Sequence, residues 1–346
     1  MIDGIAMSNS IRVLEPGLQT CIQDYPGRIG YWRVGIPLSG PMDAIAFKLA
    51  NLLVGNPASA AALEVQFVGV KLEFLGDAVI ALTGGDWQPL LDDEPIPLWE
   101  TVSVRSGQIL ACPWARTGAR LYIAIAGGLE AEAILGSKSA FPSGFGGAGP
   151  LKADDLLSFG AAAATTECWV KTAARPTYPD EWSVEVTVGP HFDWLDSNGQ
   201  ETLLDGPWKI TGRSDRTGMR LKGPQLTFSS RALDKDPQHG PDPTNVVSAG
   251  YPLGAVNLCG DTPIILPADA PTMGGFINPV VVVSASLWKI GQARPGQTLR
   301  FKLIGIEEAI ELRRQFEELT SPASIETVAA RSGEHDADCD GGTEDA

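Results

Sequence analysis

The sequence predicts a mainly β protein with a few helices, folded as two β-rich halves. The chain holds 39 glycines and 26 prolines, which favour many short strands joined by tight turns over a helical bundle. Short runs rich in β-branched residues recur along it between Gly-rich joints, as they do in barrels and folded-over sheets. Its 346 residues, 44% of them hydrophobic, suffice for two substantial cores.

The first β-rich half is expected over residues 11–160, after a short disordered extension at 1–10. Asp43 is a good N-cap for a helix over 44–54, which carries an apolar stripe and ends before Gly55. A second, short helix is expected at 130–135. Strands are expected at 11–14, 63–68, 70–74, 78–83, 101–104 and 120–126.

The second half is expected over 183–305, after an Ala/Thr-rich and Pro-containing linker at 161–182. A charged amphipathic helix at 306–320 follows it, and a disordered acidic tail at 321–346 ends the chain. Strands are expected at 183–188, 226–229, 257–258, 263–266, 280–284 and 298–303.

Charge and cysteine usage limit the kinds of partner. The formal net charge of −16 argues against nucleic acid, whose phosphates need clustered Lys and Arg. The five cysteines form no C-x-x-C pair, and neither a secretory leader nor a run long enough to span a bilayer is evident. We therefore expect a cytoplasmic protein with free thiols and no membrane partner.

Several familiar catalytic patterns are absent. The chain has no P-loop and no G-x-S-x-G elbow, and its only G-x-G-x-x-G, at Gly144–Gly149, is followed by Pro150 where a helix should begin. Three histidines give little support to a catalytic triad or a zinc site, so no metal is expected. No Met-Lys-Met biotin attachment site is present, so biotin would have to arrive on another chain.

A first polar constellation lies between residues 23 and 43. Asp24, Arg28, Arg33 and Ser39 sit in a Gly/Pro-rich run that ends at Asp43. A guanidinium can clamp a carboxylate with its planar fork, and glycines let a ligand approach backbone N–H groups. The alternative is structural: an ion pair between Asp24 and Arg28 would organise the loop, and capping alone would explain Asp43.

A second constellation places three arginines around Ser214 and Asp215. They are Arg213, Arg216 and Arg220, a local basic cluster in an acidic chain. Such a cluster indicates an anion site. The alternative is a loop network that ties the two halves together.

A third constellation covers residues 257–276. Asp261 and Asp269 could orient an amide N–H of a substrate, while Gly274 and Gly275 would let a ligand lie close to the backbone. The alternative is a pair of β-turns.

These segments together resemble the carboxyltransferase module of urea carboxylase, of the second allophanate-hydrolase-type component and of the C-type subunit of bacterial 5-oxoprolinase. The resemblance runs from about residue 11 to about residue 301 in the family's order. Its motifs are Asp24-Tyr-Pro-Gly-Arg-Ile-Gly-Tyr-Trp32, Ser39-Gly-Pro-Met-Asp43, Ala50-Asn-Leu-Leu-Val-Gly-Asn56, Ser214-Asp-Arg-Thr-Gly-Met-Arg-Leu221 and Gly260-Asp-Thr-Pro-Ile-Ile-Leu266.

The resemblance implies two cyclophilin-like β-barrel halves with the active site in the cleft between them. It also implies partners: a biotin carboxylase and biotin carrier that deliver carboxybiotin and bind ATP, or 5-oxoprolinase A and B type subunits. It assigns catalysis to Asp24, Arg28, Ser214, Asp215 and Arg216, and substrate binding to Ser39, Arg220, Asn245, Asp261, Gly274 and Gly275.

Three functions follow from the resemblance. The leading one is a carboxyltransferase-type subunit of a multi-component ATP-dependent enzyme that moves a carboxyl group to urea or a related amide. The second is a subunit for ATP-dependent opening of 5-oxoproline, without biotin. The third is a non-catalytic regulatory protein with an inert cleft. The family pattern has His where this chain has Asp242, which leaves the substrate open.

Overall fold

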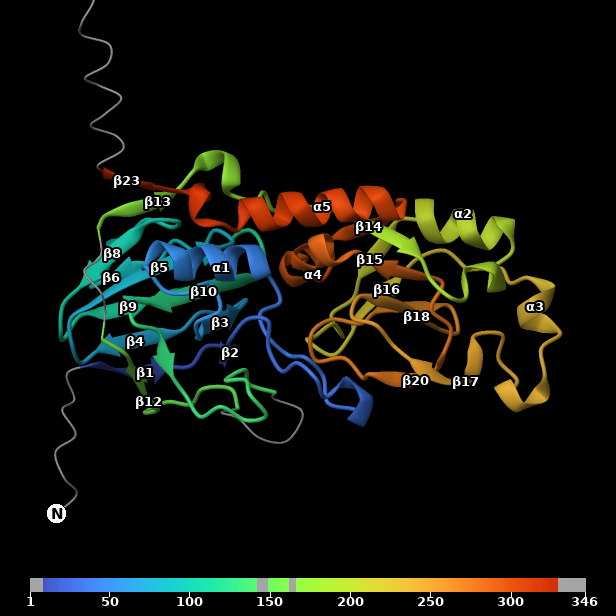
Figure 1. Ribbon diagram of the computed structural model, residues 1–346, viewed down its shortest axis with the longest axis horizontal. Coiled ribbons are helices and arrows are strands. Elements are labelled where there is room, and N and C mark those ends of the chain that lie inside the picture. The colour runs from blue at the N-terminus through green and yellow to red at the C-terminus, as the bar shows by residue number, and fades with distance from the viewer. Residues whose placement is uncertain (1–8, 142–148, 162–165, 329–346) are drawn as a thin grey trace, which may run out of the picture.

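The computed structural model describes residues 9–141, 149–161 and 166–328. Two β-rich halves lie side by side along the long axis of the molecule, and helix α5 (Ile306–Leu319) lies across both (Figure 1). The predicted fold class, mainly β with few helices, is confirmed. Among the described residues, no helix is long and apolar enough to cross a membrane.

The first half consists of two sheets packed over a common core. The seven-stranded sheet runs in the order β11 (Leu129–Glu130), β12 (Leu156–Phe159), β1 (Ser10–Glu15), β4 (Lys71–Phe74), β9 (Ile109–Ala111), β6 (Leu90–Leu91) and β7 (Glu94–Pro95). The five-stranded sheet runs β2 (Gln19–Gln23), β3 (Ala62–Gln66), β10 (Arg120–Ile125), β5 (Ala78–Gly84) and β8 (Thr101–Val104).

Helix α1 (Ala44–Leu53) covers the outer face of the five-stranded sheet, where Phe47 meets Tyr122 edge to face with ring centroids 5.8 Å apart. Both faces of the central strands β3 and β10 are therefore covered, and every residue of the two strands is buried. Any charged residue on these strands consequently lies inside the protein and needs a partner.

The second half closes into a barrel. Its strand order is β14 (Glu181–Val188), β21 (Val280–Val282), β18 (Ala255–Cys259), β19 (Thr262–Ile265), β16 (Met219–Lys222), β15 (Trp208–Ile210) and β22 (Thr298–Leu303). A two-stranded ribbon of β17 (Asn245–Gly250) and β20 (Met273–Phe276) lies beside the barrel. The helices of this half are α2 (Ser197–Asp205), α3 (Ser230–Leu233) and α4 (Leu287–Gln292).

Short 3-10 turns occur in several places along the described chain, at η2 (Trp32–Val34), η3 (Thr172–Ala174), η4 (Phe192–Trp194), η5 (Pro237–His239), η6 (Ser284–Ser286) and η7 (Pro322–Ser324).

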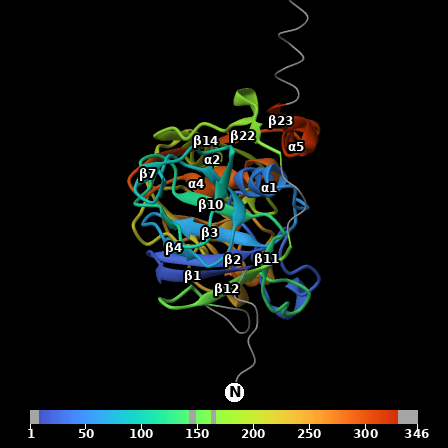
Figure 2. The same ribbon diagram turned by 90° about the vertical axis from the view of Figure 1, so that its left-hand side faces the viewer.

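The chain beyond the barrel returns to the first half. Phe316 of α5 packs in the same apolar cluster as α1, and Figure 2, which looks onto the first half, shows both helices on one side of its strands. Strand β23 (Ile325–Thr327) then pairs with β13 (Cys168–Val170). The expected linker thus contains a strand, and the expected tail begins with ordered structure. Its one acid in this stretch, Glu326, accepts a hydrogen bond from Trp169 Nε1 at 2.6 Å.

The remaining parts of the expected tail and N-terminal extension lie outside the described residues, as does most of the Gly144–Gly149 motif. Helix α1 is confirmed, with Asp43 Oδ1 accepting from the N–H groups of Ile45 and Ala46. Two other expectations are wrong. Residues 130–135 form the end of β11 and a turn, and 226–229 contribute only a single bridge from Phe228 to Leu195. The periodicity of such short apolar runs does not distinguish strand, turn and helix.

Candidate functional site between the two halves

A pocket of about 460 Å³ lies where the two halves and α5 meet. The segment from Leu38 to Met42 forms one wall, β-barrel loops and α4 form another, and α5 closes it. The lining is mainly apolar: Tyr25, Pro26, Leu38, Ser39, Pro41, Met42, Ala44, Leu253, Pro267, Ala268, Ser284, Leu287, Trp288, Ile290, Arg313 and Phe316. Its size and composition are those of a small-molecule site with few polar groups.

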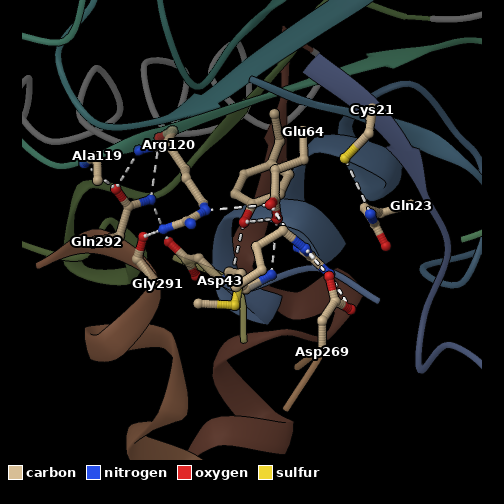
Figure 3. A network of polar contacts seen from close by, with 12 residues as sticks. Cys21, Gln23, Asp43, Glu64, Ala119, Arg120, Asp269, Gly291 and Gln292 are labelled. Atoms are coloured by element: carbon tan, nitrogen blue, oxygen red, sulfur yellow. Dashed lines mark hydrogen bonds and ion pairs between the residues drawn. The ribbon is translucent and has the colours of Figure 1, made fainter. Parts of the chain in front are cut away.

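Behind the wall segment 38–42, a buried polar network joins the two halves (Figure 3). Arg216, from the β15–β16 loop, donates to both oxygens of Asp269, at 2.6 and 3.1 Å, and to Glu64 of β3 at 2.7 Å. Its Nη2, one of the two nitrogens that donate to Asp269, also donates to the carbonyl of Gly40 at 2.8 Å. All three side-chain nitrogens of Arg216 therefore donate to partners inside the protein.

Glu64 is the centre of the network. Its Oε2 accepts from Tyr122 Oη and from the N–H of Met42, each at 2.8 Å, and its Oε1 also accepts from Arg120 at 3.2 Å. Burial alone would raise the pKa of Glu64, but the guanidiniums of Arg216 and then Arg120 outweigh it, so the pKa lies below its usual value. Glu64 is therefore a buried anion held by two cations.

Asp43 extends the network from α1 to α4. Its Oδ2 accepts from Gln292 Nε2 at 2.8 Å, while Gln292 Oε1 accepts the N–H groups of Ala119 and Arg120. Arg120 in turn donates to the carbonyl of Gly291. Burial raises the pKa of Asp43 to about 6, although hydrogen bonds from Gln292 and the backbone oppose it. Figure 3 shows Asp43, Gln292 and Arg120 meeting across this contact between the halves.

Arg28 supports the wall segment 38–42 from the first half. Its guanidinium donates to the carbonyls of Ile134 at 3.1 Å and Ser139 at 2.7 Å, and reaches Ser39 Oγ at 3.5 Å. Its N–H donates to the carbonyl of Leu38 at 2.6 Å. Asp24 makes no ion pair with Arg28. The Asp24 carboxylate instead accepts from Ser137 Oγ, Lys138 N and Ser139 Oγ at 2.5–2.7 Å.

The wall segment is thus fixed at successive residues. Arg28 holds Leu38 and Ser39, Arg216 holds Gly40, and Glu64 holds Met42. The N–H of Ser39 also donates to the carbonyl of Ala268 at 3.0 Å. Ser39 adopts φ 56°, a left-handed conformation that costs a non-glycine residue energy and persists only where its surroundings enforce it. The segment can therefore present the Ser39 side chain to the pocket in one fixed position.

Ser214 and Asp215 lie in the same loop as Arg216, and Arg220 lies in β16 directly after it; the hydrogen bonds of their side chains with described residues stay within residues 213–220. Ser214 Oγ accepts from the N–H of Arg220 at 3.1 Å, and Asp215 Oδ1 accepts from Thr217 and Gly218. Arg220 donates to the carbonyl of Arg213 at 2.8 Å. None of these three residues lines the pocket described above. Their contacts shape the loop that delivers Arg216.

The remaining predicted binding residues lie on the barrel side, away from the pocket lining. Asn245 and the two glycines, Gly274 and Gly275, belong to the β17–β20 ribbon, and Asp261 is exposed in the β18–β19 turn. A Cβ on Gly274 would lie 2.6 Å from Tyr251 Oη, so this glycine makes room for a neighbouring side chain. The structure does not bring these four residues to the pocket.

Sequence reasoning missed Glu64, Arg120 and Gln292, and it missed the pocket residues Trp288 and Arg313. For Glu64 and Arg120 a signal was present, since each is the one charged residue of a mostly apolar strand. No group of three or more His, Cys, Asp or Glu suited to a metal ion occurs among the described residues.

Fold and pocket together describe a two-half, mainly β protein with a pocket where the halves meet. The chain matches the family model "Carboxyltransferase domain, subdomain A and B" over residues 34–303, and it belongs to that family. It is similar to "Urea amidolyase" of Saccharomyces cerevisiae, with 38% identity over 88% of this chain and 17% of that protein. It is also similar to the C-type subunit of 5-oxoprolinase from Escherichia coli, with 30% identity over 89% of this chain and 97% of that protein.

Among solved structures, the Kluyveromyces lactis urea amidolyase superposes with a TM-score of 0.86 and 35% identity, over 93% of this chain and 20% of that one. This chain spans about a fifth of the urea amidolyases that it matches. Its relatives are thus components of larger enzymes or subunits of multi-component ones, and this chain fits the same role.

Proposed function

We propose that this chain is the carboxyltransferase component of a multi-component, ATP-dependent enzyme and transfers a carboxyl group to a nitrogen of urea or a related amide. The observation that supports it is the apolar pocket between the two halves, one wall of which is fixed in place by Arg28, Arg216 and Glu64. Identity is 37–38% to urea amidolyases and 29–30% to the C-type subunits of 5-oxoprolinases.

The pocket suits a biotin ring. Its volume of about 460 Å³ falls within the range of small-molecule sites, and flat apolar side chains such as Trp288 and Tyr25 can cover the ring. Carboxybiotin, delivered by a partner that also uses ATP, supplies the carboxyl group, which leaves the biotin nitrogen for the acceptor nitrogen while the acceptor's proton goes the other way. This chain's residues bind and orient the two reactants and keep water out, which supplies much of the rate.

Ser39 is the residue that we assign to the reactants. Its hydroxyl lies in the pocket wall and can hydrogen-bond a carboxylate oxygen or an amide of the acceptor. Arg28 and Arg216 are positioning residues in this proposal, because the Arg28 guanidinium reaches Ser39 Oγ and Arg216 donates to the carbonyl of Gly40. Asp24 positions residues 137–139, and Ser214 and Asp215 shape the Arg216 loop, so their direct participation stays a prediction.

One observation favours a second candidate. The E. coli 5-oxoprolinase component aligns over almost its whole length, so this chain also has the extent of a subunit of that kind. In that case the partners would be A and B type subunits, the substrate would be a lactam, and no biotin would take part.

The test begins with the tagged full chain, recovered from its source cells with its partners and probed with streptavidin. The complex is then given ATP and labelled bicarbonate with urea, guanidine or 5-oxoproline as acceptor. We expect a biotinylated partner and acid-labile label on a urea-type acceptor. Ser39→Ala should lower that transfer without slowing carboxylation of biotin on the partner, and Ser248→Ala, an exposed serine of β17, is the control.

Two other outcomes would contradict the proposal. Partners without biotin, together with ATP-dependent opening of 5-oxoproline, would replace the proposal by the second candidate. Full activity of an Arg28→Ala, Arg216→Ala double variant that remains folded would show that the pocket wall is not the catalytic site, as expected of a regulatory protein with an inert cleft.

A further inference from the structure

The pocket carries a charge at one end only. Of its lining residues, Arg313 alone is charged, in a protein whose formal net charge is −16. Arg313 belongs to α5, which lies beyond the family-matched region of residues 34–303. The helix that closes the pocket therefore also supplies its cation.

A second cation stands behind the same wall. Lys48 of α1 donates to Thr320 Oγ1 at 2.7 Å, and its Nζ lies 5.2 Å from the ring centroids of both Tyr25 and Phe316. The guanidinium carbon of Arg313 lies 5.6 Å from the centroid of the same Phe316 ring. Tyr25 and Phe316 both line the pocket, so one aromatic wall is in contact with two cations.

One carboxylate, Glu317, pairs with Arg313 and lies close enough to Lys48 to affect its charge. Glu317 accepts from Arg313 Nε at 2.7 Å across one helical turn. Burial lowers the pKa of Lys48, the nearby Arg313 lowers it further, and Glu317 opposes them, as expected where two positive charges are only partly compensated. Among the described residues, no acceptor engages the two terminal nitrogens of Arg313. They form the flat edge that binds a carboxylate in two parallel hydrogen bonds.

We propose that Arg313, supported by Lys48 behind the Tyr25–Phe316 wall, is the carboxylate-binding end of this pocket, and that the site takes a small amide or lactam bearing a carboxylate. The proposal deepens the proposed function by naming the charge of the ligand, which for urea is the carboxylated product, N-carboxyurea; its location in the same pocket rests on that function. The uncharged remainder of the ligand then lies against the apolar lining.

Matched probes that differ only in charge test this. N-carboxyurea is compared with biuret, and 5-oxoproline with its neutral primary amide, each titrated into the full chain by calorimetry and by the fluorescence of the tryptophans, one of which, Trp288, lines the pocket. We expect at least one carboxylate to bind roughly tenfold more tightly than its neutral counterpart, and added salt to shrink the difference. The pair that discriminates identifies urea-type or lactam chemistry.

Single substitutions show which cation causes the preference for carboxylate probes. Arg313→Gln should abolish the preference for the carboxylate, and Lys48→Met should reduce it. Arg314→Gln should keep it, since Arg314 is the neighbouring residue on the same helix and pairs with Glu311 at the surface. Equal affinity for both members of each pair, no binding of any probe at millimolar concentration, or a preference that survives Arg313→Gln would overturn the proposal.

The binding test is independent of catalysis. A chain that prefers carboxylates but transfers no carboxyl group leaves this inference standing and removes the proposed function. A chain that transfers carboxyl groups but binds charged and neutral probes equally does the reverse.

Discussion

The two sides of the wall segment 38–42 differ sharply in chemistry. On one side lie buried charges, among them Glu64, Arg216 and Asp269, which bond to one another, to the backbone of the segment and to Arg120 and Tyr122. On the other side lies a pocket that is mainly apolar and has one charged lining residue. The difference teaches that charged motifs visible in the sequence, such as the one that holds Arg216, fix the shape of the wall, while inconspicuous residues form most of the pocket lining.

The largest loss of stability should come from removing a charge from the buried polar network. Arg216→Met leaves Glu64 with one cation and Asp269 with none of its Arg216 hydrogen bonds, both in the protein interior. Breaking a buried ion pair by removing one partner typically costs about 3–5 kcal/mol, because the remaining charge is uncompensated. Denaturant unfolding at neutral pH should show a loss of that order, or a chain that no longer folds.

Arg220→Met is the matched control, four residues further along the chain in β16. Its guanidinium reaches only the carbonyl of Arg213, and its loss should cost within about 1 kcal/mol. Equal losses in the two variants would mean that the buried network does not hold the halves together.

The next effect is a dependence on pH at Asp43. Because burial raises its pKa from 3.8 to about 6, the folded protein binds a proton here more tightly than the unfolded chain. The stability therefore falls as pH rises from about 4 to about 6, by at most about 3 kcal/mol, and the deficit persists above that window. Glu64 has the opposite sign: its lowered pKa contributes stability at neutral pH that is lost as pH falls below about 4.5.

Asp43→Asn should remove the first of these slopes. The measurement is the free energy of unfolding of both proteins between pH 4 and pH 7, and the difference, variant minus parent, should rise with pH. Asp196→Asn, at the exposed N-cap of α2, should show no such rise. If the difference in unfolding free energy between Asp43→Asn and the parent does not change with pH, the pKa of Asp43 in the parent lies near its ordinary value.

Much of the fold could be predicted from the sequence because local chemistry determined it. Asp43 and Gly55 mark the two ends of α1, and the β-branched runs at 101–104 and 298–303 form strands over those same residues. The helices α2, α3 and α4 were missed, and β23 was taken as tail. These are short elements, and they are stabilised by packing against distant parts of the chain, which a local pattern does not contain.

The candidate site was predictable only in part. Motif chemistry singled out Arg28, Ser39 and Arg216, and the structure brings all three to the wall segment. It could not tell that both guanidiniums are buried, since that depends on distant partners: Ile134 and Ser139 for Arg28, and Glu64 and Asp269 for Arg216. Arg313 carried no signal, because on a charged surface helix one arginine resembles the next until the fold places one of them in a pocket.

A smaller effect is expected from Arg28→Lys. The guanidinium donates from separate nitrogens toward Ile134, Ser139 and Ser39, and a single ammonium cannot reproduce that fork. The carbonyl of Ser139 would lose its Arg28 hydrogen bond in a buried site, at a cost of about 1–3 kcal/mol. Thermal and denaturant unfolding measure it, with the exposed Arg33→Lys as control. If both lysine variants are as stable as the parent, charge alone holds the segment.

The smallest effect on stability should come from the pocket side, at Arg313→Gln. The Arg313 side chain is half exposed; it lies over the Phe316 ring and pairs with Glu317 one turn away, an ion pair worth about 0.3–0.5 kcal/mol on a helix. Unfolding should therefore change by no more than about 0.5 kcal/mol, while the preference for carboxylate probes disappears. Arg216→Met should show the converse, a large loss of stability for a side chain that meets no ligand. If Arg313→Gln were instead as destabilising as Arg216→Met, α5 would help to hold the two halves together. The wall segment would then not separate stabilising residues from residues of the pocket.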